Sequence, residues 1–115
     1  MQDPSGKQRW EESIEQVGLV CGCVLKKDNK YLLVQEKQGK VYGLWNLPAG
    51  YVDKGETLQQ AAKREAKEEV GYDVEVGELL LVVHDTAKES VKHAFRGTII
   101  GGDLKIQTEE LLDAK

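Results

Sequence analysis

Three acidic side chains, Glu65, Glu68 and Glu69, stand at spacings i, i+3 and i+4 in a segment with a helical pattern. At these spacings they would lie together on one face of the helix, in its last turns. Like charges so placed repel one another, and each carboxylate also meets the negative end of the helix dipole. A hard divalent cation would relieve both penalties, because it prefers carboxylate and carbonyl oxygens as ligands. The spacing therefore indicates a metal site, and the alternative is a solvated acidic helix face.

The helix that carries these glutamates is predicted to run from Leu58 to Val70. Thr57 and Gln60 match a capping box at its start, and Gly71 stands where a glycine commonly ends a helix. The same periodicity assigns the two faces of the helix. The face expected to meet a sheet holds Leu58, Ala61 and Ala62 and continues into Glu65, Glu68 and Glu69. The face expected in solvent holds Gln60, Lys63 and Lys67.

These residues belong to a longer pattern that begins before the helix. Gly50 is followed after five residues by Glu56, and after seven more by Arg64-Glu65-Ala66-Lys67-Glu68-Glu69-Val70-Gly71-Tyr72. This segment resembles the Nudix box, G-x5-E-x7-R-E-U-x-E-E-x-G-U, at every spacing. Ala66 and Tyr72 fill the two positions marked U, which are usually bulky and apolar, and they are mild departures. The preceding Trp45-Asn46-Leu47-Pro48-Ala49 is similar to the strand that leads into the box in this family.

The resemblance covers roughly residues 17 to 111 and implies an α+β fold, a mixed β-sheet sandwiched between helices with a loop-helix-loop catalytic motif. It implies hydrolysis of a pyrophosphate bond in a nucleoside-diphosphate-linked substrate, with Mg²⁺ as cofactor and Mn²⁺ as the alternative ion. Bound metal would neutralise the substrate's charge and lower the pKa of an attacking water. A Nudix-fold module that binds or senses a nucleotide without cleaving it is the alternative function. Such modules usually lack box glutamates, all of which are present here.

The resemblance also implies a role for each matched residue. Glu65 and Glu69 resemble the principal metal ligands, Glu68 a further ligand or the base that activates water, and the carbonyl of Ala49 a backbone ligand. Arg64 resembles the arginine that orients the box glutamates. The residues expected to shape the motif are Gly50, Glu56 and Gly71.

The substrate itself is left open among nucleoside triphosphates, nucleotide sugars, ADP-ribose and dinucleotides. Within the family some classes are marked downstream of the box, and the matching stretch, residues 85–90, shows none of those marks. Three residues are candidates for substrate contact. Trp45 could stack on a base or lie in the core, Tyr51 falls in the box loop, and Glu89 could act as a base outside the box.

Around the box, the hydrophobic pattern predicts short strands and the order β-β-β-α-β-β. The apolar run Leu79–Val83 reads as a buried strand, and Ala49-Gly50 reads as the opening of a turn. The predicted strands are Val17–Leu25 and Tyr31–Val34 as a hairpin, Gly43–Leu47, Val74–Asp85 and Ala94–Ile100, and Glu109–Leu112 could begin another element.

Length and composition set the remaining expectations. The 115 residues suit one domain, here residues 17–115 after a polar arm of residues 1–16, and the net charge of -4 argues against binding to nucleic acid or membranes. Cys21 and Cys23 read as core residues, and no targeting or membrane-spanning segment is visible, which favours a cytoplasmic protein. Compared with the proteins it resembles, the chain is expected to lack a final strand and helix. We therefore expect a homodimer or a shortened chain, unless an arm carrying Trp10 covers the exposed face.

Overall fold

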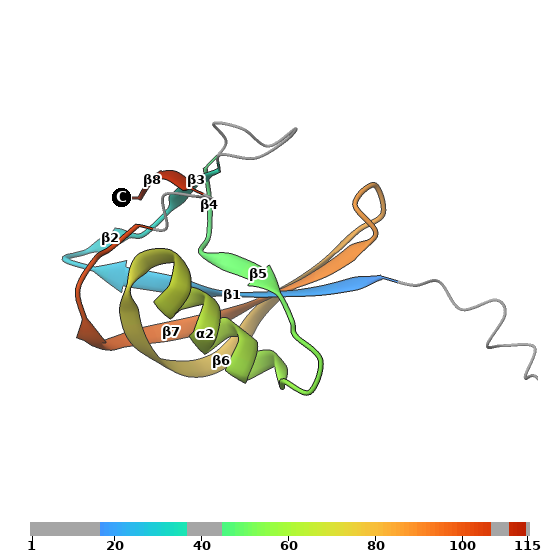
Figure 1. The fold of residues 1–115 in the computed structure, drawn as a ribbon, viewed down its shortest axis with the longest axis horizontal. Helices are drawn as coiled ribbons and strands as arrows, with labels where there is room; N and C mark the ends of the chain where they lie inside the picture. Colours follow the sequence, from blue (N-terminus) through green and yellow to red (C-terminus); the bar gives the residue numbers. More distant parts are fainter. Residues whose placement is uncertain (1–16, 37–44, 107–110, 115) are drawn as a thin grey trace, which may run out of the picture.

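Two β-sheets and one α-helix make up the described part of the chain, which comprises residues 17–36, 45–106 and 111–114 of a computed structural model (Figure 1). The elements are β1 (Gly18–Lys27), β2 (Lys30–Tyr31), β3 (Val34–Glu36), β4 (Trp45–Asn46), β5 (Ala49–Tyr51), α2 (Leu58–Val70), β6 (Tyr72–Asp85), β7 (Ser90–Gly102) and β8 (Leu111–Ala114). The predicted arm with Trp10 lies outside the described residues. No helix within the described ranges is long and apolar enough to cross a membrane.

The larger sheet is mixed and has the order β2-β1-β7-β6, with β5 paired to β1 as well. β1 and β7 run parallel, with Gly18 opposite Ser90 and Leu25 opposite Gly97, whereas the other pairs are antiparallel. β1 therefore lies inside the sheet: β7 pairs along one side of β1, and β5 and β2 pair along its other side. This arrangement confirms the predicted α+β class with a mixed sheet.

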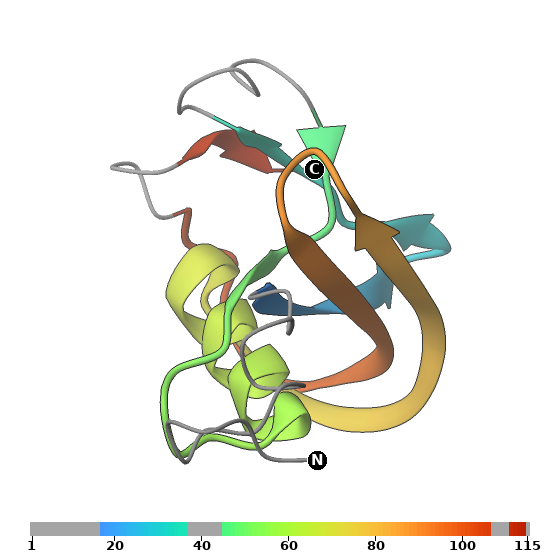
Figure 2. The same cartoon turned by 90° about the vertical axis from the view of Figure 1, so that its right-hand side faces the viewer.

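The helix α2 crosses one face of this sheet, as Figure 2 shows. Its bounds are those predicted, and both hydrogen bonds of the capping box between Thr57 and Gln60 are present. Gly71 ends it with a φ of 84°, a left-handed conformation that favours glycine. The helix and the sheet share one core, in which Cys21 and Cys23 are fully buried as predicted. The other core residues include Leu25, Ala61, Ala62, Ala66, Val70, Val74 and Phe95.

The segments around the helix depart from the predicted elements in several places. The expected return strand Tyr31–Val34 is divided, because β2 pairs with β1 while β3 pairs with β4 and β8 in a second, three-stranded sheet. Ala49-Gly50 is a strand, β5, rather than the opening of a turn, because it pairs with residues 20–22 of β1. β6 and β7 begin earlier than predicted. Residues 43, 44, 109 and 110 of the other predicted elements lie outside the described ranges.

The apolar run of β6 is exposed, which makes the prediction that it is buried wrong. Leu81 is 55% exposed, and its neighbours in the range 79–83 are between 41% and 50% exposed. In the described part of the chain β6 pairs only with β7, so it forms an edge of the sheet. The expected second layer of helix is not present among the described residues either, and α2 is the one helix that covers the sheet there.

Candidate active site

The loop from β5 to α2 brings the first and last parts of the box together. Within this loop, the Glu56 amide donates to the Asp53 carbonyl at 3.0 Å, and the Asp53 amide donates to Glu56 Oε1 at 2.8 Å. The two bonds close a tight turn that holds the Glu56 carboxylate toward the helix. Thr57 then starts α2. The loop is therefore shaped by its own backbone and by one acidic side chain.

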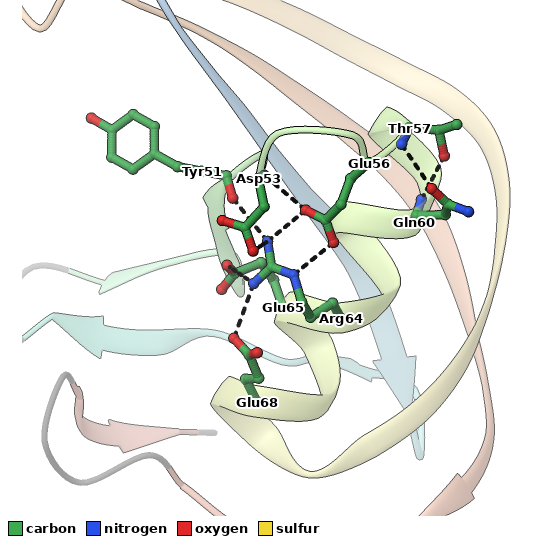
Figure 3. A network of polar contacts seen from close by, with 8 residues as sticks. All are labelled: Tyr51, Asp53, Glu56, Thr57, Gln60, Arg64, Glu65 and Glu68. Carbon is green, nitrogen blue, oxygen red and sulfur yellow. Dashed lines mark hydrogen bonds and ion pairs between the residues drawn. The ribbon is translucent and has the colours of Figure 1, made fainter.

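Arg64, in the second turn of α2, binds the Glu56 carboxylate through two hydrogen bonds (Figure 3). Its Nε donates to Glu56 Oε2 at 2.7 Å and its Nη2 donates to Glu56 Oε1 at 2.9 Å. Nη2 also donates to the Tyr51 carbonyl at 2.9 Å and lies 3.5 Å from Asp53 Oδ2. A guanidinium matches a carboxylate in this fork-like geometry, and the pairing fixes loop and helix relative to each other.

The remaining nitrogen of Arg64 faces the other box glutamates. Nη1 donates to Glu65 Oε1 at 2.7 Å and to Glu68 Oε2 at 3.0 Å. The i, i+4 pairing of Arg64 with Glu68 agrees with the spacing in the sequence. Arg64 thus offsets the repulsion among three carboxylates, those of Glu56, Glu65 and Glu68.

Glu65 and Glu69 direct their carboxylates against the short strand β5. A Cβ atom on Gly50 would lie 2.3 Å from the carboxylate carbon of Glu65, so only glycine leaves room for that side chain. The amide of the neighbouring Ala49 donates to Glu69 Oε2 at 3.1 Å. Both side chains are buried, with residue exposures of 8% for Glu65 and 6% for Glu69. Two buried carboxylates therefore lie against adjacent residues of one strand.

Glu68 differs from these two residues. The prediction that all three glutamates continue the buried face is confirmed for Glu65 and Glu69 and wrong for Glu68, whose side chain is 55% exposed. Glu68 lies at the exposed edge of α2, where it pairs with Arg64 instead of packing against the sheet. Gln60, Lys63 and Lys67 are exposed, as predicted.

The donor set at β5 fits a hard divalent cation, because it consists of buried carboxylate oxygens beside a strand with backbone carbonyls. Among the described residues, no group of three or more His, Cys, Asp or Glu side chains is already gathered closely enough to hold a metal ion. Of the three glutamates predicted as ligands, the fold therefore places Glu65 and Glu69 at this strand.

The contacts of Arg64 set the ionisation of its partners. The hydrogen bond from Arg64, together with the bond from the Asp53 amide, lowers the pKa of Glu56 to about 2. The hydrogen bond to Glu56 also raises the pKa of Arg64 above its ordinary value. Both groups therefore stay ionised at neutral pH. Burial raises the pKa of the Cys21 and Cys23 thiols to about 11, which makes them poor nucleophiles and agrees with a core role.

A cavity of about 360 Å³ adjoins β5. Of the candidate substrate residues, Tyr51 lines it, whereas Trp45 lies 37% exposed in β4 and Glu89 lies in the turn between β6 and β7, with its carbonyl accepting from the Gly18 amide. Asn46, Lys88 and Lys92 also line the cavity, and no pattern in the sequence predicts that these positions come together. Its lining is Val20, Asn46, Ala49, Gly50, Tyr51, Val83, Asp85, Lys88, Ser90 and Lys92.

Comparison with known proteins agrees with this fold and motif. The family model described as the NUDIX domain matches residues 17–115. The chain is 37% identical over 110 residues to a protein named putative nudix hydrolase 1 from Caenorhabditis elegans, an alignment that covers 91% of this chain and 30% of that protein. It is 38% identical over 86 residues to a protein named ADP-ribose pyrophosphatase from Methanocaldococcus jannaschii, covering 71% of this chain and 51% of that protein.

A solved structure gives the same result for the fold. A MutT NUDIX hydrolase from Burkholderia pseudomallei superposes with a TM-score of 0.80 at 29% identity, covering 88% of this chain and 82% of that one. The chain belongs to the Nudix family. It spans about half or less of the length of the two curated relatives.

Proposed function

We propose that this chain is a metal-dependent pyrophosphohydrolase that cleaves a nucleoside-diphosphate-linked substrate by attack of water on phosphorus. The observation that carries the proposal is the placement of two buried carboxylates, Glu65 and Glu69, against Ala49-Gly50. Arg64 donates to Glu65 and the Ala49 amide donates to Glu69. Burying two like charges on one helix face is still costly, and a divalent cation is a further partner that their oxygens suit. The names of relatives point to the same class of reaction, since one is an ADP-ribose pyrophosphatase.

In this proposal Glu65, Glu69 and the carbonyl of Ala49 hold the cation, Mg²⁺ or Mn²⁺. When bound, the cation neutralises charge on the pyrophosphate and makes a water more acidic. Glu68 serves as a further ligand or takes the proton from the attacking water. Its side chain is exposed, and Arg64 holds it beside Glu65, because the same Nη1 donates to both carboxylates.

Arg64 and Glu56 do not touch the reacting atoms in this scheme. Arg64 holds the rotamers of Glu65 and Glu68, and Glu56 fixes Arg64 while bracing the loop that carries β5 into the helix. Both are positioning residues, and their contribution is a site that is rigid before the substrate arrives. Preorganised charge of this kind is worth more than charge that must be assembled during the reaction.

The decisive experiment is a product assay over nucleoside triphosphates, nucleotide sugars, ADP-ribose and dinucleotides, with Mg²⁺ and with a chelator. We expect a nucleotide product from at least one substrate with Mg²⁺ and none with the chelator. Binding of a nucleotide without turnover anywhere on the panel, in protein shown to be folded, would contradict the proposal and favour the non-catalytic module. We place this activity in the cytoplasm, in keeping with two free, buried cysteines.

A further inference from the structure

The cavity beside β5 is cationic although the protein as a whole is acidic. Its lining carries Lys88 and Lys92 against a single carboxylate, that of Asp85, so its formal charge is two minus one, or +1. The chain has a net charge of -4. Asp85 is moreover engaged with the turn that follows it, because its Oδ1 accepts from the amides of Ala87 and Lys88 at 3.0 and 3.1 Å. Among the residues that line the cavity, positive charge therefore exceeds negative charge by one.

Lys92 is held in a defined place within this lining. Its Nζ donates to Asn46 Oδ1 at 2.6 Å, and the same oxygen accepts from the Leu47 amide at 2.8 Å. Asn46 belongs to β4 in the smaller sheet and Lys92 to β7 in the larger one. The bond thus joins the two sheets at the cavity. Asn46 also precedes Ala49 by three residues, so it ties the lysine to the strand against which Glu65 and Glu69 lie.

A lysine that a hydrogen bond holds in place is better suited to bind a ligand than a fully solvated lysine. An ammonium group is a compact point charge that binds phosphate oxygens, and partial burial strengthens the contact. A pyrophosphate carries negative charge on both of its phosphate groups, so a cation held by Glu65 and Glu69 leaves room for a further positive partner. Ala49, Gly50 and Tyr51 of β5 line the cavity that contains Lys92, so a cationic side chain borders the strand against which Glu65 and Glu69 lie.

We propose that Lys92, positioned by Asn46 and supported by Lys88, binds a phosphate group of the substrate in this cavity, beside the strand against which Glu65 and Glu69 lie. This inference rests on the proposed function for the orientation of the substrate. It assigns the cavity to a phosphate-bearing part of the ligand, whereas a neutral sugar or a base alone would gain little from two lysines. The volume of about 360 Å³ lies at the lower end of the range for small-molecule sites.

Titration calorimetry with inorganic pyrophosphate and Mg²⁺ tests the assignment without requiring turnover. We expect Lys92→Met to weaken binding about tenfold or more, as loss of a charge-assisted hydrogen bond implies, and Lys92→Arg to keep most of the affinity. Asn46→Ala should weaken binding less than Lys92→Met, because it removes the positioning and leaves the charge. Lys63→Met, which removes an equal charge from the exposed face of α2, is the matched control and should bind like the unchanged protein.

Three results would overturn the assignment. They are unchanged affinity in Lys92→Met, an equal loss in Lys63→Met, and no binding of pyrophosphate to the unchanged protein. Thermal melts of every variant separate loss of the bridge to Asn46 from loss of binding, because a purely structural role lowers the melting temperature and spares affinity in the folded protein. If the affinities follow the expected order but no substrate is cleaved, the proposed function fails and the role of Lys92 stands.

Discussion

Arg64 and Glu56 are joined by two hydrogen bonds of 2.7 and 2.9 Å between a helix and the loop that precedes it. They are eight positions apart in the chain. The same guanidinium reaches Glu65 and Glu68, so a single side chain connects the loop to two of the helix glutamates. Disturbing this pair should therefore change both stability and the geometry of the site.

The first prediction concerns acid stability. Because the folded pKa of Glu56 is lowered from 4.5 to about 2, its contribution to stability is fully present above about pH 4.5 and is lost as the pH falls toward 2. Glu56→Gln should flatten this part of a plot of melting temperature against pH. Glu78→Gln removes the carboxylate of an exposed ion pair with Arg96 and serves as the control. An unchanged acid profile in Glu56→Gln would contradict the pairing.

The second prediction concerns catalysis by the buried carboxylates. Glu69→Gln should lower kcat by at least about 100-fold, because it removes a group that would hold charge-stabilising metal at the reacting centre. Lys63→Ala and Lys67→Ala, on the exposed face of α2, should leave kcat nearly unchanged. Circular dichroism establishes that each variant is folded. Near-normal turnover in a folded Glu69→Gln protein would remove Glu69 from the proposed metal site.

The third prediction concerns the ion itself. Mg²⁺ should raise the melting temperature, because binding relieves repulsion between Glu65 and Glu69 and stabilises the folded state by about 2.7 kcal/mol at ~100 times the dissociation constant. The shift should be absent from the double variant Glu65→Gln, Glu69→Gln. Scanning calorimetry with and without millimolar Mg²⁺ measures it. An unchanged midpoint in the original protein would count against ion binding before substrate arrives.

The fourth prediction concerns the close approach at Gly50. In Gly50→Ala the new methyl group would meet the Glu65 carboxylate at 2.3 to 2.4 Å, so either that side chain or β5 must shift. We expect kcat to fall about tenfold or more, a loss consistent with displaced catalytic groups. Gly101→Ala is a suitable control, because its added carbon would lie at an ordinary 3.4 Å from Asp73. Equal activity in the two variants would contradict the contact.

The fifth prediction concerns assembly and starts from the exposed run of β6. Leu81 is 55% exposed on an edge strand, and such apolar surface is commonly covered by a partner. The expected homodimer stays a prediction, and light scattering at micromolar concentration tests it. Leu81→Asp should convert the dimer to a monomer, whereas Thr98→Asp, at another exposed position, should not. A monomeric original protein that keeps its melting temperature without residues 1–14 would contradict both the dimer and a covering arm.

The sequence by itself determined the helix of the box and the family. The capping box, the glycine cap and the alternation of apolar and charged residues are local features, so Leu58–Val70 and its end at Gly71 could be predicted from nearest neighbours. The same periodicity placed Glu65 and Glu69 on the buried face. The periodicity predicted the burial of Glu68 wrongly, because helical spacing alone does not show where the sheet ends or that Arg64 pairs with Glu68 at the exposed edge of the helix.

Only the tertiary structure decided which strands pair and which distant residues they bring together. The parallel pairing of β1 with β7 places Lys92 opposite Val20, and β5 pairs with the same stretch of β1, which brings residues 46 and 92 into contact. Strand pairing over such distances depends on which edges remain free once the core has formed, and no local pattern contains that information. The exposure of Leu79–Val83 has the same origin: their composition suits a buried strand, but their burial depends on what packs beside them.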